Sequence, residues 1–105
     1  MNDLLVAYIV EFVGKKLTYL DISECSRCTD MSLLAIAENA THLCRLGIRR
    51  IPSLSRSALE EVLFACCDLV AVDLRRCPSL DVKNGVHPLK RKYPSVEFLR
   101  VSGKR

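Results

Sequence analysis

The chain has no apolar stretch long enough to cross a lipid bilayer. The longest, Leu4–Val13, spans ten residues and includes Glu11, whereas a transmembrane helix needs about 20 predominantly apolar residues. Asn2 and Asp3 precede this stretch in place of the lysine or arginine that opens a secretory signal peptide. We therefore expect no membrane span.

Sequence patterns typical of enzymes are also absent. The chain has no glycine-rich loop of the kind that binds phosphate groups, and its only histidines are His42 and His87. No Ser, Asp or Glu pattern around either histidine suggests a catalytic triad. We expect both histidines to be exposed and charged, and we expect no enzymatic activity, no catalytic residue and no cofactor.

Aromatic residues are scarce, with no tryptophan, three tyrosines and three phenylalanines. Surfaces that bind single-stranded nucleic acid stack the bases on aromatic side chains, so this scarcity argues against a nucleic-acid partner. The net charge of +4 is moderate. Lys90–Lys92 and Lys104–Arg105 make the C-terminal end basic, and we expect that end to be solvated.

What the chain does contain is a repeat of 26 residues. Four segments carry apolar residues at their first, fourth and sixth positions, and their first residues lie 26, 26 and 27 positions apart. The sequence therefore predicts an α/β leucine-rich-repeat solenoid of about 3.5 repeats, with parallel strands on the concave side and helices on the convex side. The segments are Leu17–Cys25, Leu43–Ile51, Leu69–Cys77 and Val96–Val101, and the predicted strands are centred on Leu20, Leu46, Val72 and Leu99.

Short helices are predicted between these strands. Apolar residues at three- and four-residue spacing follow Thr29 or Asp30, either of which can cap a helix. The next helix begins at Ser55 or Ser57, and Ser57 with Glu60 matches a capping box.

We interpret residues 1–105 as a single domain. Asp3–Val13 is predicted to be the helix of an incomplete first repeat (residues 1–14), capped by Asp3 and ended by Gly14. Residues 80–105 are predicted to form a C-terminal capping repeat, whose helix begins near Pro88.

Two stretches resemble the cysteine-containing leucine-rich repeat. They are Cys66–Cys77, and Leu17–Cys25 followed by Thr29 and Asp30. In that class a cysteine replaces the usual asparagine at the strand end, a Thr-Asp pair opens the helix, and a cysteine often closes it. Ile51 and Ala40 depart from this pattern at one strand end and one helix end.

Such repeats are typical of F-box leucine-rich-repeat proteins and of the antagonist-of-mitotic-exit family, and similar ones occur in the mitochondrial coupling factor B family. Leu89–Phe98 is similar to the C-terminal ending of F-box leucine-rich-repeat proteins. The resemblance implies a protein-interaction module that recognises substrates for a ubiquitin ligase. The alternative is a structural or assembly subunit of a large complex. The F-box itself, which docks to a ligase adaptor, has no counterpart in this chain.

The six cysteines fit this class better than a metal site. Cys25 and Cys28 have the CxxC spacing of zinc and redox sites, but a second CxxC is absent. Cys25 and Cys77 occupy matching strand ends, so we expect both to be buried, reduced structural thiols, and we expect no bound metal. Cys67, next to Cys66, is the best candidate for a reactive thiol. Reduced thiols indicate an intracellular location, cytoplasmic or nuclear, with a mitochondrial location as the alternative.

Side chains alternate between the two faces of a strand. With Leu20 and Ile22 inside, Tyr19 and Asp21 point outward, and the same register brings out their neighbours on the following strands. We predict that this concave face binds a partner protein through Tyr19, Asp21, Arg45, Arg49, Arg50, Asp73, Arg75, Arg76, Phe98 and Arg100.

Arg49 and Arg75 suggest the chemistry of that partner. Neighbouring parallel strands lie about 4.8 Å apart, so the two arginines are expected to be close like charges. They indicate a partner with an acidic patch, because arginine pairs well with carboxylates and phosphates. The alternative is that Asp21 and Asp73 neutralise them locally.

A second contact is predicted at the N-terminal edge. The first strand has a neighbour on one side only, and the Leu4–Val13 helix is apolar on all sides, which is typical of a buried helix. We expect this edge to pack against another subunit, a second copy or an upstream repeat. A bulge that blunts the strand edge is the alternative. The predicted contact residues are Leu5, Tyr8, Ile9 and Phe12.

Overall fold

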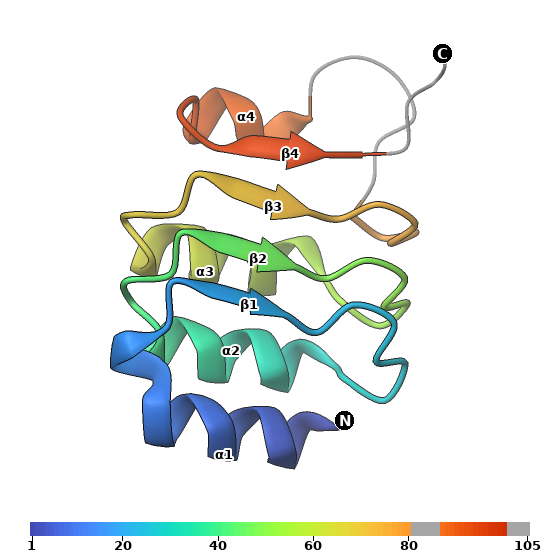
Figure 1. The fold of residues 1–105 in the computed structure, drawn as a ribbon. Coiled ribbons are helices and arrows are strands. Elements are labelled where there is room, and N and C mark those ends of the chain that lie inside the picture. Colours follow the sequence, from blue (N-terminus) through green and yellow to red (C-terminus); the bar gives the residue numbers. More distant parts are fainter. Residues whose placement is uncertain (81–86, 101–105) are drawn as a thin grey trace.

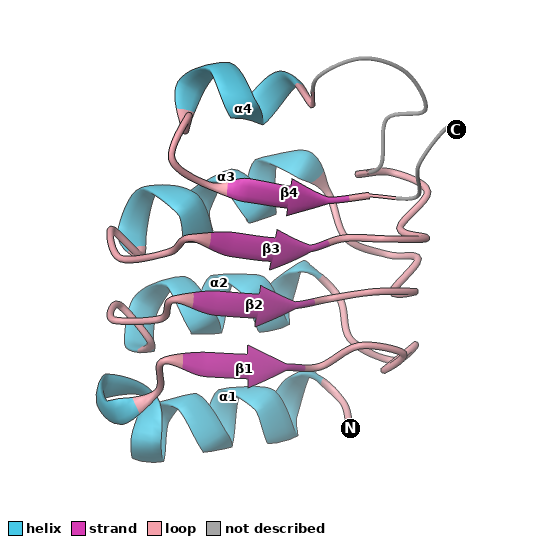
Figure 2. Cartoon of the chain, turned by 45° about the horizontal axis from the view of Figure 1, so that its top comes forward, coloured by secondary structure: helices cyan, strands magenta, loops and turns pink. Residues whose placement is uncertain are grey.

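A computed structural model describes residues 1–80 and 87–100, which form short strands that alternate with helices (Figures 1 and 2). Part of the predicted capping repeat, residues 81–86 and 101–105, lies outside the described residues. The strands are β1 (Tyr19–Asp21), β2 (Arg45–Gly47), β3 (Ala71–Asp73) and β4 (Glu97–Leu99). The helices are α1 (Asp3–Val13), α2 (Asp30–Asn39), α3 (Arg56–Ala65) and α4 (Pro88–Lys92), and the 3-10 helix η1 (Gly14–Lys16) follows α1.

The four strands form one parallel sheet in the order β1-β2-β3-β4, which confirms the predicted order and direction. Leu20 pairs with Leu46, and Leu46 pairs with Val72, at the predicted 26-residue spacing. Helices α1, α2 and α3 stack in the same order on one side of the sheet (Figure 2).

The core is built from residues that recur at the same place in successive repeats. Ile22, Ile48 and Leu74 are all fully buried, and each lies one residue beyond its strand. Burying one such side chain contributes about 1.5–3 kcal/mol, so the repeat of apolar positions is the main source of the stability of this stack.

The predicted centre of the last strand is wrong by one residue. Val72 pairs with Phe98, not with Leu99. β4 begins directly after Val96, whereas one residue, Val70, lies between Leu69 and the start of β3. The N–H of Glu97 bonds to Val70 O, which sets this shorter spacing. Phe98 therefore turns inward and stacks on the ring of His87, at a centroid distance of 5.1 Å.

His87 is buried, with 2% of its surface exposed, so the expectation that it is exposed and charged is wrong. Its Nδ1 accepts the N–H of Leu89 at 3.2 Å and caps α4, while its Nε2 lies 2.7 Å from Leu80 O. A carbonyl oxygen only accepts, so the proton is on Nε2 and the ring is neutral. His42 is exposed, as predicted.

The N-caps differ in part from the predicted ones. Thr29 caps α2 and Ser55 caps α3, each being one of the two predicted candidates, whereas the predicted capping box of Ser57 and Glu60 is wrong. Asn2 caps α1 through its side-chain oxygen, so the predicted cap Asp3 is also wrong. The helix bounds Asp3–Val13 and the start of the last helix at Pro88 are as predicted.

Gly14 follows α1 at the predicted place but for a different reason. Its backbone is right-handed, with φ of −55°, so no left-handed conformation requires glycine there. A Cβ at this position would lie 2.6 Å from Asn39 O. Glycine is required because the end of α1 approaches the backbone of α2 this closely.

The carboxylate of Asp3 binds the N-terminus of the next helix. It accepts the N–H and the hydroxyl of Thr29 at 2.8 and 2.6 Å, and the hydroxyl of Ser32 at 2.6 Å. The carboxylate of Asp30 likewise accepts the N–H and the hydroxyl of Ser55, both at 2.7 Å. Partial burial opposes ionisation of Asp3, but the hydrogen bonds from Ser32 and Thr29 outweigh it and hold the pKa of Asp3 below its ordinary value of 3.8.

Two buried thiols also join neighbouring repeats. The thiol of Cys77 donates to Ile48 O at 2.8 Å, and that of Cys66 donates to Ala40 O at 3.2 Å. Burial raises the pKa of Cys66 to about 11, so it stays protonated and can donate. Cys77 is fully buried, as predicted.

Cys25 is only half-buried, so the prediction that it is buried is wrong. Its thiol lies 3.7 Å from Ser23 O, within its own turn. Cys77 bonds to the residue that follows β2 in the preceding repeat, whereas the described chain has no strand in front of β1 for Cys25 to reach.

We expect Asp3→Ala to reduce the free energy of unfolding by about 1–3 kcal/mol, because three donors from Thr29 and Ser32 lose their acceptor. The folded pKa of Asp3 lies below the unfolded one, so its contribution is complete above about pH 5 and is lost as the pH falls through the folded pKa. The difference between the parent protein and the variant should therefore shrink in acid. Urea denaturation at several pH values measures this.

Asp68→Ala is the matched control, since Asp68 is exposed and lies 3.4 Å from the exposed His42. We expect a change within about 0.5 kcal/mol at every pH. An equal loss in both variants would show that the Asp3 carboxylate does not hold α2.

We expect Cys77→Ala to cost on the order of 1–3 kcal/mol, because it removes a buried thiol and leaves Ile48 O without that donor. Cys25→Ala, at the matching place in the first repeat, should cost less than about 1 kcal/mol because Cys25 is half-buried. Thermal unfolding of both variants in reducing buffer compares them. Equal costs would contradict the role assigned to the Cys77 bond.

Candidate protein-binding surface

The sheet face turned away from the helices is open to solvent in the described structure (Figure 2). Successive side chains on each strand alternate, so the first and third residues of every strand point to this side. We call the following residues the open sheet face: Tyr19, Asp21, Arg45, Gly47, Arg49, Ala71, Asp73, Arg75, Glu97 and Leu99.

A depression of about 270 Å³ lies on this face. Gly47 and Ala71, the smallest residues of this face, are among those that line it. A Cβ at Gly47 would lie 2.6 Å from a carboxylate oxygen of Asp21, so glycine is needed to let that side chain lie across β2. Tyr19 and Arg45 line the same depression.

Asp73 pairs with both arginines that were expected to repel one another. Arg75 binds it with two parallel hydrogen bonds of 2.9 and 2.7 Å, and Nε of Arg49 lies 3.4 Å from Asp73 Oδ2. Burial opposes ionisation of Asp73, but the hydrogen bonds from Arg75, helped by the charge of Arg49, lower its pKa below the ordinary value. Asp73 therefore neutralises Arg49 and Arg75 in part, whereas Asp21 instead accepts the N–H of Ser23.

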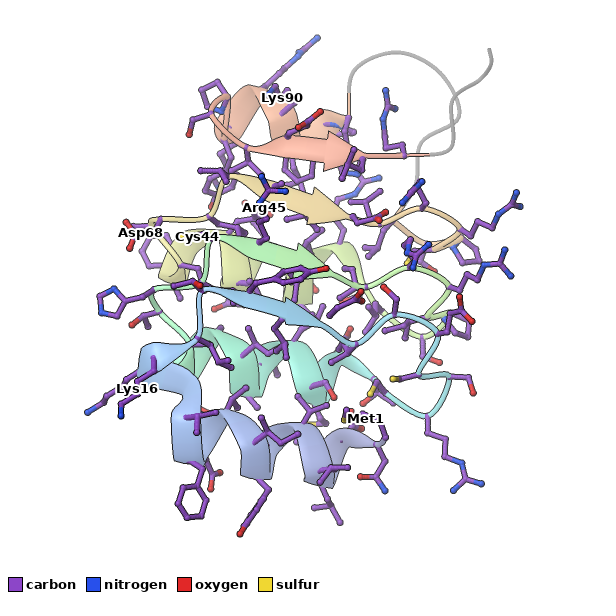
Figure 3. All side chains as sticks on the ribbon, in the orientation of Figure 1. Met1, Lys16, Cys44, Arg45, Asp68 and Lys90 are labelled. Atoms are coloured by element: carbon purple, nitrogen blue, oxygen red, sulfur yellow. The ribbon has the colours of Figure 1, made fainter. Side chains whose placement is uncertain are left out.

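Three other arginines of the predicted site have no carboxylate partner among the described residues. Arg45 projects from the open sheet face (Figure 3). Arg50 and Arg76 are exposed in the turns that follow β2 and β3. These guanidinium groups, rather than Arg49 and Arg75, are the ones available to an anionic partner.

Arg50 and Arg76 also have an unusual backbone. Their φ angles are 59° and 62°, and Glu24, the matching residue of the first repeat, has 68°. This left-handed region costs a residue with a Cβ on the order of 1–2 kcal/mol. The ladder between repeats holds the conformation, since the N–H of Arg50 donates to Arg75 O and the N–H of Glu24 donates to Arg49 O.

Besides Arg50 and Arg76, which lie in turns, two more predicted residues do not belong to the open sheet face. Phe98 points inward because of the register of β4, and Leu99 takes the outward place beside Asp73. Arg100 lines a separate hollow with His87 and Lys90. Glu97 and Leu99 were missed, because the spacing of Val96, Leu99 and Val101 matched the apolar pattern of the earlier strands and gave the other register.

The predicted N-terminal contact residues are largely on the surface. Leu5, Tyr8 and Phe12 are exposed, while Ile9 is half-buried. Leu4 was missed, although at 82% it is the most exposed large apolar side chain among the described residues. Its spacing of four and eight residues from Tyr8 and Phe12 is the sequence signal that would have placed it on the same helix face.

The remaining candidate groups are dispersed. Cys28 is buried at the place of Leu54 and Leu80 in the following repeats, and burial raises the pKa of its thiol. Cys67 is exposed, and its reactivity stays a prediction. Within residues 1–80 and 87–100, no three His, Cys, Asp or Glu residues group so that they could hold a metal ion.

No helix among the described residues is long and apolar enough to cross a membrane. No protein-family model and no curated protein sequence matches the chain.

We expect Arg50→Gly to leave the free energy of unfolding unchanged or raise it by up to about 1 kcal/mol, because glycine adopts a positive φ without strain. Arg50→Val should lower it by about 1–2 kcal/mol, since a β-branched residue tolerates this region poorly. Chemical denaturation of the two variants measures the difference.

Arg45→Val is the control for side-chain loss, because Arg45 lies in a strand, where valine is favoured. A change within about 0.5 kcal/mol is expected there. An equal effect of valine at both positions would mean that the turn after β2 has no left-handed requirement.

Proposed function

We propose that this protein is a non-catalytic protein-interaction module of the cysteine-containing leucine-rich-repeat class, and that its open sheet face binds a partner segment with acidic side chains. The observation that carries the proposal is Arg45, a cation without a carboxylate partner in the described structure, at a depression that the small side chain of Ala71 leaves open beside it.

The chemistry of the depression suits an acidic side chain. Arginine presents its N–H groups as a planar fork that matches a carboxylate. Ala71, the partner of Arg45 on the neighbouring strand, leaves room beside Arg45 for such a group to lie against the sheet, and Tyr19 and Leu99 offer apolar contact beside it. A partner segment that combines an acidic residue with a neighbouring apolar residue would use both.

The cysteines support the repeat class. The thiols of Cys66 and Cys77 bond to carbonyls of the preceding repeat, which explains why cysteine occurs at a helix end and at a strand end. Free thiols persist where the environment is reducing, and we propose an intracellular location on that basis.

Within this class, we propose substrate recognition of the kind found in F-box ubiquitin-ligase adaptors. The unpaired Arg45, Arg50 and Arg76 favour this function, since they could select an acidic target. The alternative is a structural or assembly subunit of a large complex, for which a mitochondrial location is the second choice. The exposed apolar side chains of α1 favour this alternative. Affinity purification from cells distinguishes the two: ligase scaffold and adaptor proteins would support the first, and subunits of another complex the second.

We expect that selection of random peptides on the immobilised protein enriches sequences with Asp or Glu. Arg45→Glu should weaken the selected peptides by roughly tenfold or more, because truncating or reversing a desolvated charge partner costs on the order of 2 kcal/mol. Isothermal titration calorimetry measures the affinity, and circular dichroism confirms that the fold is retained.

Arg91→Glu makes the same change of charge on α4 and serves as the control. Its affinity should stay within about twofold of the parent, since screening weakens distant surface charges. Equal weakening by both variants would indicate a non-specific effect of net charge. Unchanged affinity in Arg45→Glu would place the binding site elsewhere.

A further inference from the structure

We propose that α1 is the contact between two copies of this chain, which pack their α1 helices antiparallel across a two-fold axis at Tyr8. This proposal concerns a different surface from the open sheet face and does not depend on the function assigned there.

The surface in question is a continuous apolar stripe along α1. Leu4, Tyr8 and Phe12 are 82%, 61% and 75% exposed, and Leu5 lies beside them with 45%. The rings of Tyr8 and Phe12 pack edge to face at 5.5 Å, so the stripe is continuous between them. Together these side chains expose on the order of 400–500 Å² of apolar surface, which is as large as the largest patch on a typical monomer.

The stripe is not built to receive another helix at the repeat spacing. The same helix face on α2 is the one that packs on α1: Ser32 bonds to Asp3, and the backbone of Asn39 meets Gly14. Close packing of this kind uses small residues, and two of the three matching residues are small on α2 and two on α3. Counted from the N-caps, the matching residues are Ser32, Ala35 and Asn39 on α2, Ala58, Glu61 and Ala65 on α3, and Leu5, Tyr8 and Phe12 on α1.

Leucine and two aromatic residues at these places would hold a neighbouring helix further away than α1 holds α2. The occupant must therefore present a surface that interlocks with large side chains, not the small face of a further repeat. A second copy of α1 presents such a surface.

The stripe is self-complementary when two copies run antiparallel. Leu4, Tyr8 and Phe12 are spaced by four residues, so an axis through Tyr8 places Leu4 of each copy against Phe12 of its partner. A two-fold interface needs this property, because one patch must fit itself. The antiparallel arrangement also places the two exposed Glu11 side chains at opposite ends of the contact and opposes the two helix dipoles favourably.

The stripe is smaller than the roughly 800 Å² that each partner contributes to a stable interface of standard size. We therefore expect a weak dimer, with a dissociation constant on the order of 10–100 μM. Such a dimer forms at high concentration and dissociates on dilution.

Sedimentation equilibrium of the full chain tests the proposal over a range from about 1 μM to 1 mM. The apparent mass should rise from that of a monomer towards that of a dimer. Tyr8→Glu should remove this rise, because it buries a carboxylate next to its own copy at the axis. Phe64→Glu is the matched control: Phe64 is 78% exposed on α3, outside the stripe, and its variant should dimerise like the parent protein.

A symmetric crosslink tests the geometry separately. Tyr8→Cys, in a background with Cys67→Ser, places a thiol at the proposed axis, and mild oxidation should give a disulfide-linked homodimer. Phe64→Cys in the same background should not. A parent chain that is monomeric throughout the range overturns the proposal. Dimerisation that Phe64→Glu abolishes as strongly as Tyr8→Glu, or a Tyr8→Cys variant that fails to crosslink, overturns it as well.

Discussion

Hydrogen bonds between residues one repeat apart set the register of the stack, in which the repeated apolar residues are then buried. The Asp3 carboxylate accepts from both donors of the cap residue Thr29, and Asp30 does the same for Ser55. The start of α2 is therefore fixed relative to α1, and the start of α3 relative to α2. The helix starts and the strand register are therefore both aligned between repeats. The apolar residues of one repeat then contact the equivalent residues of the next, and the core is continuous through the stack.

The sequence predicted the first three repeats because period, apolar positions and caps all agreed there. Leu20, Leu46 and Val72 pair as expected, since the same number of residues separates each from the turn before it. The last repeat could not be predicted in this way. Val96, Phe98 and Leu99 allow two registers, and the choice depends on the packing of Phe98 against His87, a contact that no local pattern contains.

His87 and Asp3 illustrate the same limit on prediction. A histidine beside a proline has no apolar signal, yet its two ring nitrogens satisfy the N–H of Leu89 and Leu80 O, so burial becomes favourable. Asp3 stands where an N-cap would, but its neighbour Asn2 takes that place because Asp3 is bound to α2. Both outcomes depend on partners 7 or 26 residues away, beyond the reach of a local rule.

The sequence predicted most residues of the candidate site but not how their charged side chains pair. One carboxylate, Asp73, contacts both Arg49 and Arg75 and so replaces an expected repulsion with a network of attractive contacts. That leaves Arg45, Arg50 and Arg76 as the cations open to a partner. Two of them sit in left-handed turns, where glycine would be less strained. Stability does not account for arginine there, and this is a reason for the anion recognition that we propose at the edge of the open sheet face.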